Sequence, residues 1–171
     1  MSEIEISQIK DYLMNFDLFK GKEQEGINYI NDSLQRFLIT LELIPGKTQK
    51  GKLLELGANP YFMTLLVKKY RNYEIDTANY FGPQHENLFN YIDIIFNEKY
   101  NERYEFAYKH FNVEKGIFPF NDNEFDTVLC CEIIEHLTLN PTHMLYEIHR
   151  ILKPDGCLII TTPNVSRLTN M

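Results

Sequence analysis

From residue 52 onward, short apolar runs alternate with segments in which apolar residues recur every three or four positions. This alternation is typical of βαβ units, in which helices connect parallel strands. The apolar runs predict five strands, at residues 52–56, 73–79, 104–111, 125–131 and 157–162. The sequence therefore predicts an α/β domain built on a doubly wound, mostly parallel sheet.

The segments between these runs predict helices. One helix is expected after Pro60 and another within residues 86–96. The clearest helix begins near residue 141, because Asn140 is a favourable N-cap and Pro141 a favourable first helical residue. Residues 154–156, with the sequence PDG, predict the turn into the last strand.

The first 47 residues have a different pattern. Apolar residues recur at helical spacing from Ile27 to Ile44, and a shorter helix is expected around residues 6–16. Pro45 and Gly46 end the longer helix. We interpret residues 1–47 as an N-terminal helical cap and residues 48–171 as the core of the domain.

Composition narrows the classes of function. The chain has 171 residues, of which 44% are apolar and 24% charged, as in one soluble globular domain. Its net charge of −7 argues against a nucleic-acid partner, because nucleic-acid affinity comes mainly from clustered Lys and Arg. No apolar run reaches the roughly 18 residues of a membrane span, and no secretory signal is visible, so we expect a cytoplasmic protein.

A strand-to-helix turn contains the first sign of a ligand. Residues 55–59 read ELGAN, so only Gly57 remains of the G-x-G-x-x-G pattern that binds the pyrophosphate of dinucleotides. A single glycine after an acidic strand end suits a ligand that carries a nucleoside without a pyrophosphate. S-adenosylmethionine is the common example.

Two later segments carry a family resemblance. Residues 125–137 read FDTVLCCEIIEHL, and residues 144–164 read MLYEIHRILKPDGCLIITTPN. Both segments follow the glycine turn in the order found in class I S-adenosylmethionine-dependent methyltransferases similar to types 11 and 12. They resemble strand four, the following helix and strand five of that family. The resemblance covers residues 50–167 and implies a Rossmann-like fold, S-adenosylmethionine as the cofactor, and methyl transfer as the activity.

The resemblance implies a cofactor site at the carboxyl ends of the strands. Glu55 and Gly57 match the family's first motif, in which the acid supports the turn and the backbone lies close to the methionyl part of the cofactor. Ala58 and Asn59 occupy two positions of this motif at which the family often has an unspecified residue followed by a second glycine. Because asparagine tolerates left-handed backbone angles, we expect the turn to persist.

The family's second motif ends in an acid that binds both ribose hydroxyls, and Asn79 stands at that position. An amide accepts from one hydroxyl and donates to the other without charge, so we expect weaker cofactor binding. A shifted strand end would give this role to Asp76 instead. Tyr80 follows, either as a cover for the adenine or as part of the core.

Two further pairs match cofactor-binding positions of the family. Asn112 and Val113 stand where the adenine is contacted, although a polar side chain there also suits the cap of the next turn. Cys131 and Glu132 end strand four, where the family's backbone carbonyls meet the methionine ammonium.

The segment after strand four contains the candidate catalytic residues. His136, with Glu135 beside it, is placed to take a proton from the methyl acceptor, and histidine exchanges protons near neutral pH. The pattern Glu132-x-x-Glu135-His136 is similar to the metal-binding motif of ubiquinone-biosynthesis O-methyltransferases and small-RNA 2′-O-methyltransferases. The same pattern occurs in metal-free relatives, so a divalent metal is the less favoured of the two interpretations.

The resemblance also implies an acceptor, a partner and an alternative function. The acceptor is expected to be a hydroxyl of a small molecule or glycan, by analogy at the level of the family. The family's strands six and seven have no counterpart in the sequence. We therefore expect a truncated chain with little or no activity, in which strand five forms an uncovered edge where two copies pair as a homodimer. A non-catalytic binding or interaction module is the alternative.

Overall fold

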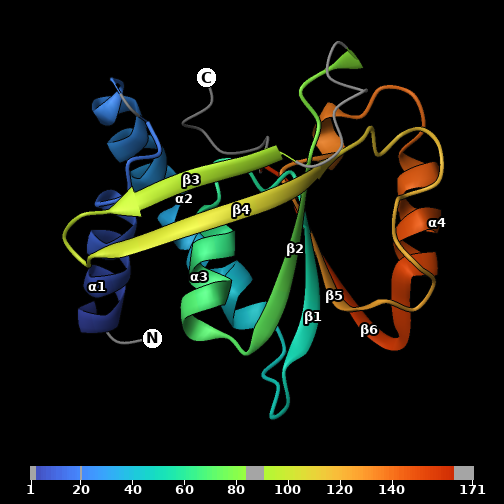
Figure 1. Cartoon of the computed structure of the whole chain (residues 1–171), viewed down its shortest axis with the longest axis horizontal. Coiled ribbons are helices and arrows are strands. Elements are labelled where there is room, and N and C mark those ends of the chain that lie inside the picture. The colour runs from blue at the N-terminus through green and yellow to red at the C-terminus, as the bar shows by residue number, and fades with distance from the viewer. Residues whose placement is uncertain (1–2, 20, 84–90, 164–171) are drawn as a thin grey trace.

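The computed structural model describes residues 3–19, 21–83 and 91–163 of the chain (Figure 1). Its elements, in chain order, are α1 (Glu3–Met14), α2 (Glu23–Leu43), β1 (Gly51–Leu56), α3 (Phe62–Tyr70), β2 (Tyr73–Asn79), β3 (Tyr91–Asn97), β4 (Glu102–His110), β5 (Phe125–Cys131), the 3₁₀ turn η2 (Ile134–His136), α4 (Pro141–Ile151) and β6 (Leu152–Thr161).

The strands form one six-stranded sheet in the order β3-β4-β2-β1-β5-β6. β1 runs parallel to β2 on one side and to β5 on the other, with Leu53 opposite Ile75 and Thr127. After β1 the chain builds the sheet outward through β2 and β4, and then returns to the other side at β5. This order confirms the predicted doubly wound, mostly parallel sheet and places its switch point between β1 and β5.

Helices pack on both faces of the sheet. α1, α2 and α3 lie on the face of Leu53, whereas α4 lies on the face of Leu54 and Leu56. Successive side chains of a strand point to opposite faces, so neighbouring leucines of β1 belong to two separate cores. Ile27, expected in the buried stripe of α2, is 36% exposed instead. None of the described helices has the length and apolar character needed to cross a membrane.

α4 begins as the sequence predicts. The side-chain oxygen of Asn140 accepts a hydrogen bond from the His143 N–H at 3.0 Å, and Pro141 is the first helical residue. Proline is favourable there because its missing N–H would have no partner within the helix. The face that carries Met144 and Ile148 is buried against the sheet.

β6 begins earlier than its apolar run predicts. It starts at Leu152, directly after α4, and Leu152 pairs with Phe125 of β5. The next pair joins Cys157 to Thr127, so residues 153–156 bulge out of the ladder where a turn was expected. Proline at position 154 fits this bulge because it has no N–H to donate to a neighbouring strand. Within the described residues, β6 forms one edge of the sheet.

The expectation of a helix within residues 86–96 is wrong where it can be tested. Residues 86–90 lie outside the described part of the chain, and Tyr91–Asn97 form β3, antiparallel to β4. Ile95 is buried, whereas three alternate side chains are 45–61% exposed: Ile92, Ile94 and Phe96. This alternation fits a strand. A short apolar run in a sequence is compatible with either a helix or a strand, and pairing with β4 selects the strand here.

β3 and β4 form a hairpin that joins the rest of the sheet at one end. β4 pairs with β2 only where Tyr108, Lys109 and His110 lie opposite the last three residues of β2. The other end reaches α1 (Figure 1), where the Tyr12 hydroxyl donates to Glu102 at 2.7 Å.

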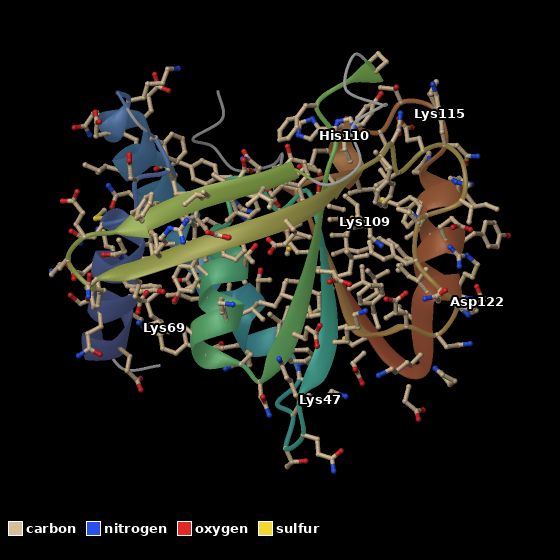
Figure 2. The ribbon with its side chains drawn as sticks, in the orientation of Figure 1. Lys47, Lys69, Lys109, His110, Lys115 and Asp122 are labelled. Atoms are coloured by element: carbon tan, nitrogen blue, oxygen red, sulfur yellow. The ribbon has the colours of Figure 1, made fainter. Side chains whose placement is uncertain are left out.

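Two more contacts hold the far end of this hairpin. The side chain of Asn97 donates to the Tyr12 carbonyl at 3.0 Å. Lys69 of α3, labelled in Figure 2, places its Nζ 3.2 Å from Glu102. α1 and α3 thus support the part of the hairpin that β2 does not reach.

Candidate functional site

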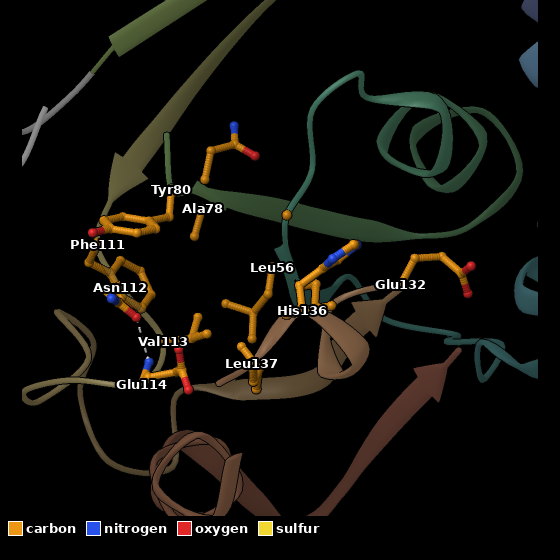
Figure 3. A pocket seen from close by; sticks show the side chains of 13 residues that line it. Leu56, Ala78, Tyr80, Phe111, Asn112, Val113, Glu114, Glu132, His136 and Leu137 are labelled. Carbon is orange, nitrogen blue, oxygen red and sulfur yellow. Dashed lines mark hydrogen bonds between the residues drawn. The ribbon is translucent and has the colours of Figure 1, made fainter. Parts of the chain in front are cut away.

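A cavity of about 260 Å³ opens at the carboxyl ends of β1, β2, β4 and β5 (Figure 3). Most of its wall is apolar, with Leu56, Phe111 and Leu137 on different sides. Seven residues that the sequence predicts as functional line it: Gly57, Asn79, Tyr80, Asn112, Val113, Glu132 and His136. Five others do not line it: Glu55, Ala58, Asn59, Cys131 and Glu135. Open α/β sheets bind ligands at this position, beside the switch point.

Gly57 gives the turn after β1 its shape. Its φ is +65°, and a Cβ at this position would lie 3.0 Å from Cδ1 of Ile133 across the cavity. Glycine adopts such a backbone with the least strain, and without a Cβ it leaves that space open. The N–H of Gly57 donates to the Ala78 carbonyl at 2.8 Å, which attaches the turn to the end of β2.

Asn79 joins this turn to the start of α3. Its side-chain oxygen accepts the Asn59 N–H at 2.9 Å, and its amide nitrogen donates to the Tyr61 hydroxyl at 3.2 Å. The Tyr61 hydroxyl in turn donates to Asp93 of β3. Asn79 is only 4% exposed, so this amide has a structural role and also lines the cavity. Asp76, the alternative at this position, lies farther back on β2, with Lys52 Nζ 3.3 Å from its carboxylate.

Glu55 lies on the opposite face of β1, toward α3. Its carboxyl is 4% exposed and accepts a hydrogen bond from the Thr64 hydroxyl. Burial raises the pKa of Glu55 to about 8, and the hydrogen bond from Thr64 only partly offsets this effect. Glu55 therefore joins β1 to α3 and does not line the cavity, so its support of the turn stays a prediction.

Asn112 and Glu114 form the wall that follows β4. The Asn112 side-chain oxygen accepts the Glu114 N–H at 2.8 Å, which is the capping arrangement that the sequence left open. Glu114, which sequence reasoning missed, accepts the N–H groups of Leu139 and Asn140. Burial opposes ionisation of Glu114, but these backbone hydrogen bonds outweigh it and lower its pKa. The carboxylate thus joins the wall to the start of α4.

Glu132, Glu135 and His136 do not converge on one point. The Glu132 carboxylate accepts the Thr161 hydroxyl at 2.9 Å and, in Figure 3, points away from Asn112 and Glu114. Glu135 Oε1 is 4.0 Å from Nε2 of His136, whose side chain is 77% exposed. Among the described residues, no group of three or more His, Cys, Asp or Glu side chains is arranged to hold a metal ion.

Cys131 and Tyr80 differ in their surroundings. Burial raises the pKa of the Cys131 thiol to about 11, and the side chain packs against the core on the α2 side. Tyr80 is 37% exposed and lies with its ring centre 5.3 Å from that of His110. Tyr80 is therefore at the rim of the cavity and not in the core.

The charged side chains that line this cavity are acidic. Glu114 and Glu132 are its carboxylates, and no Lys or Arg occurs among the described residues that form it. A phosphate would lack a cationic partner here, whereas a flat apolar group would contact the walls and a cation would face the carboxylates. The cavity therefore suits a neutral or cationic ligand with an apolar ring.

The sequence matches known proteins over part of its length. Residues 87–160 match a family model described as a methyltransferase domain. An uncharacterised protein of Methanocaldococcus jannaschii is 33% identical over 112 residues, which are 62% of this chain and 49% of that protein. The chain thus spans about half the length of the curated relative it matches.

Solved structures share the fold. A Haloferax volcanii protein named as a methyltransferase, solved with the Trm112 methyltransferase activator, has a TM-score of 0.55 and 17% identity, covering 88% of this chain and 59% of that one. A Methanococcus maripaludis protein named as an S-adenosyl-L-methionine-dependent methyltransferase has a TM-score of 0.52 and 17% identity, covering 83% and 63%. At these identities the likeness concerns the fold.

Proposed function

We propose that the chain is a class I S-adenosylmethionine-dependent methyltransferase and that the cavity beside Gly57 binds S-adenosylmethionine. One observation carries the proposal: an apolar cavity, with no Lys or Arg among its described lining residues, lies where Gly57 follows β1 and Asn79 ends the neighbouring β2. Its walls fit an adenine ring. Asn79 retains an amide hydrogen and an oxygen lone pair beyond those used by Tyr61 and Asn59, and these fit ribose hydroxyls.

Methyl transfer to a hydroxyl of a small molecule or glycan is the reaction we propose. When bound, S-adenosylmethionine supplies an activated methyl group, so the protein's main tasks are to position the acceptor and exclude water. His136 lines the cavity and is mostly exposed, which gives an acceptor access to its imidazole. We assign it the role of base, with Glu135 as the neighbouring carboxylate.

Calorimetry with S-adenosylhomocysteine tests the cofactor site. The wild-type protein is expected to bind with micromolar affinity. Gly57→Ala places a methyl group against Ile133 at a left-handed backbone position and should weaken binding at least tenfold. Gly46→Ala is the matched control, because a Cβ there meets nothing within 4 Å. Equal binding by both variants contradicts this placement of the cofactor.

A non-catalytic interaction module is the second candidate. Two observations favour it: Asn79 already holds the turn through both ends of its amide, and β6 lies at the sheet edge within the described residues. In that case two copies pair through β6. Folded wild-type protein that sediments as a dimer and binds no S-adenosylhomocysteine supports the module over the enzyme.

A further inference from the structure

We infer that a second cavity, on the other side of Glu132, binds the methyl acceptor, and that this acceptor is an uncharged molecule with several hydroxyl groups. The inference rests on the proposed function, because it takes the first cavity as the cofactor site. The second cavity has a volume of about 460 Å³ and lies between α2 and the end of β6. Glu132 lines both cavities, so the two sites adjoin. His136 lines only the first cavity, so the reacting hydroxyl of an acceptor in the second must extend past Glu132 to reach the cofactor and this imidazole.

Glu132 is a fixed boundary between the sites. Its backbone has a φ of +55°, and its N–H donates to the Thr161 carbonyl at 2.9 Å. The Thr161 hydroxyl donates to its carboxylate at 2.9 Å, so both ends of the residue are attached to β6. These two bonds hold Glu132 beside β6, where it lines the second cavity.

One helix face supplies the polar groups of the second cavity. The side chains follow each other along α2 at steps of one, three or four residues, which places them on one face: Tyr29, Asp32, Ser33, Arg36 and Thr40. This polar face lies beside the apolar stripe that buries Phe37 and Leu41. Hydroxyl, carboxylate and guanidinium groups therefore meet on one wall.

Arg36 has donors left for a ligand. Its Nη2 donates to the Ser33 hydroxyl at 3.0 Å and to the Tyr29 hydroxyl at 3.3 Å. Its Nη1 is 3.9 Å from Glu132 Oε1, too far for a hydrogen bond. The guanidinium is thus held in place by α2, while Nε and Nη1 make no hydrogen bond to the described part of the chain.

Thr40 adds an unsatisfied hydroxyl to the same wall. The residue is 1% exposed, and its Oγ1 has no hydrogen-bond partner among the described residues. Buried hydroxyls are nearly always paired, and leaving one unpaired costs stability. A bound hydroxyl group satisfies this atom, directly or through a water molecule, as either donor or acceptor.

The charges of the wall select against anions. Asp32 and Glu132 contribute two carboxylates and Arg36 one guanidinium, so a carboxylate or phosphate on the acceptor meets a net negative wall. A hydroxyl group donates to a carboxylate and accepts from a guanidinium, and it pairs equally well with Ser33 and Thr40. An uncharged polyol matches this mixture of donors and acceptors.

Saturation-transfer NMR on the S-adenosylhomocysteine-saturated protein tests the inference. The probes are the methyl glycosides of glucose, galactose and mannose, with succinate as the anionic probe. We expect saturation transfer to at least one glycoside, and adding succinate should not reduce that signal. Arg36→Leu and Asp32→Asn should each weaken glycoside binding about tenfold or more, because each removes charged hydrogen-bonding groups.

Controls separate this inference from the cofactor proposal. Arg103→Leu is the matched variant, since Arg103 is half exposed and pairs with Glu105 on the hairpin. It should leave glycoside binding unchanged, and all three variants should still bind S-adenosylhomocysteine. Wild-type protein that binds S-adenosylhomocysteine but no glycoside, or that binds succinate more tightly, overturns the acceptor inference alone. Glycoside binding without S-adenosylhomocysteine binding refutes the cofactor proposal.

Discussion

The side-chain oxygen of Asn79 accepts a hydrogen bond from the backbone N–H of Asn59 at 2.9 Å, which joins the end of β2 to the turn after β1. The same amide donates to the Tyr61 hydroxyl, so one side chain positions both the turn and the first residues before α3. The residue expected to bind ribose is therefore also a structural support of the cavity.

Asn79→Ala should lower the free energy of unfolding by about 1–3 kcal/mol, because it removes the acceptor of the Asn59 N–H and the donor to the hydroxyl of the buried Tyr61. Urea unfolding followed by circular dichroism measures the change. Asn72→Ala is the control, because Asn72 is exposed and its one side-chain hydrogen bond, to the Lys47 carbonyl, is 3.5 Å long. A loss no larger than that of the control contradicts the structural role of Asn79.

Glu55 should make the protein less stable as the pH rises. Its pKa is about 8 in the folded protein against a usual 4.5, so the folded state binds the proton more tightly. The free energy of unfolding therefore falls between about pH 4.5 and pH 8 and is constant above that range.

Glu55→Gln removes this titration and keeps an oxygen for the Thr64 hydroxyl. The variant should match the wild type near pH 4 and exceed it by a few kcal/mol at pH 8, measured by urea unfolding across the range. A difference that does not change with pH shows that Glu55 ionises normally in the folded state.

Arg150 of α4 fixes the segment that leads from the cavity wall to β5. It donates to the carbonyls of Phe118 and Phe120 at 3.0 Å, and to the carboxylates of Asp122 and Glu147 at 2.7 Å. Arg150→Lys cannot reproduce this fork of donors and should cost about 1–3 kcal/mol in urea unfolding.

The same replacement on the hairpin gives the comparison. Arg103 forms an ion pair with Glu105, and both side chains are about half exposed. Arg103→Lys should therefore change the free energy of unfolding by less than about 0.5 kcal/mol. Equal losses for the two replacements mean that the backbone contacts of Arg150 contribute little.

The N-cap of α4 should account for about 1 kcal/mol of stability. Asn140→Ala removes the acceptor of the His143 N–H and is expected to lower the midpoint of thermal unfolding. Asn140→Asp keeps an acceptor and should retain most of the wild-type midpoint. If the aspartate variant loses as much as the alanine variant, the side-chain acceptor is not what stabilises the helix start.

The sequence predicts the strands beside β1 well because their apolar runs match their buried positions in the sheet. The bounds of β2 (Tyr73–Asn79) and β5 (Phe125–Cys131) match the expected ranges to the residue. The prediction for β3 is wrong because the sequence YIDIIFN is equally consistent with one face of a helix. Only pairing with β4 makes this segment a strand. Runs of apolar residues predict the parallel strands, whereas an edge strand with one exposed face gives a weaker signal of this kind.

The site was only partly predictable. The motifs identify Gly57 and Asn112 as residues at strand ends, and both line the cavity. They do not show that Asn79 is engaged by Asn59 and Tyr61, because this depends on how two loops approach each other. Glu114 was missed for the same reason, since its backbone partners follow about 25 residues later in the chain.

The hairpin of β3 and β4 makes the cavity dependent on the first helix of the chain. β4 carries the wall at Asn112 and Val113, yet it joins the sheet through only three residue pairs. Tyr12 of α1 holds the other end of the hairpin, through Glu102 of β4 and Asn97 of β3. Because β4 lies between α1 and the cavity wall, we expect substitutions that displace Tyr12 to alter the cavity as well, although α1 does not line it.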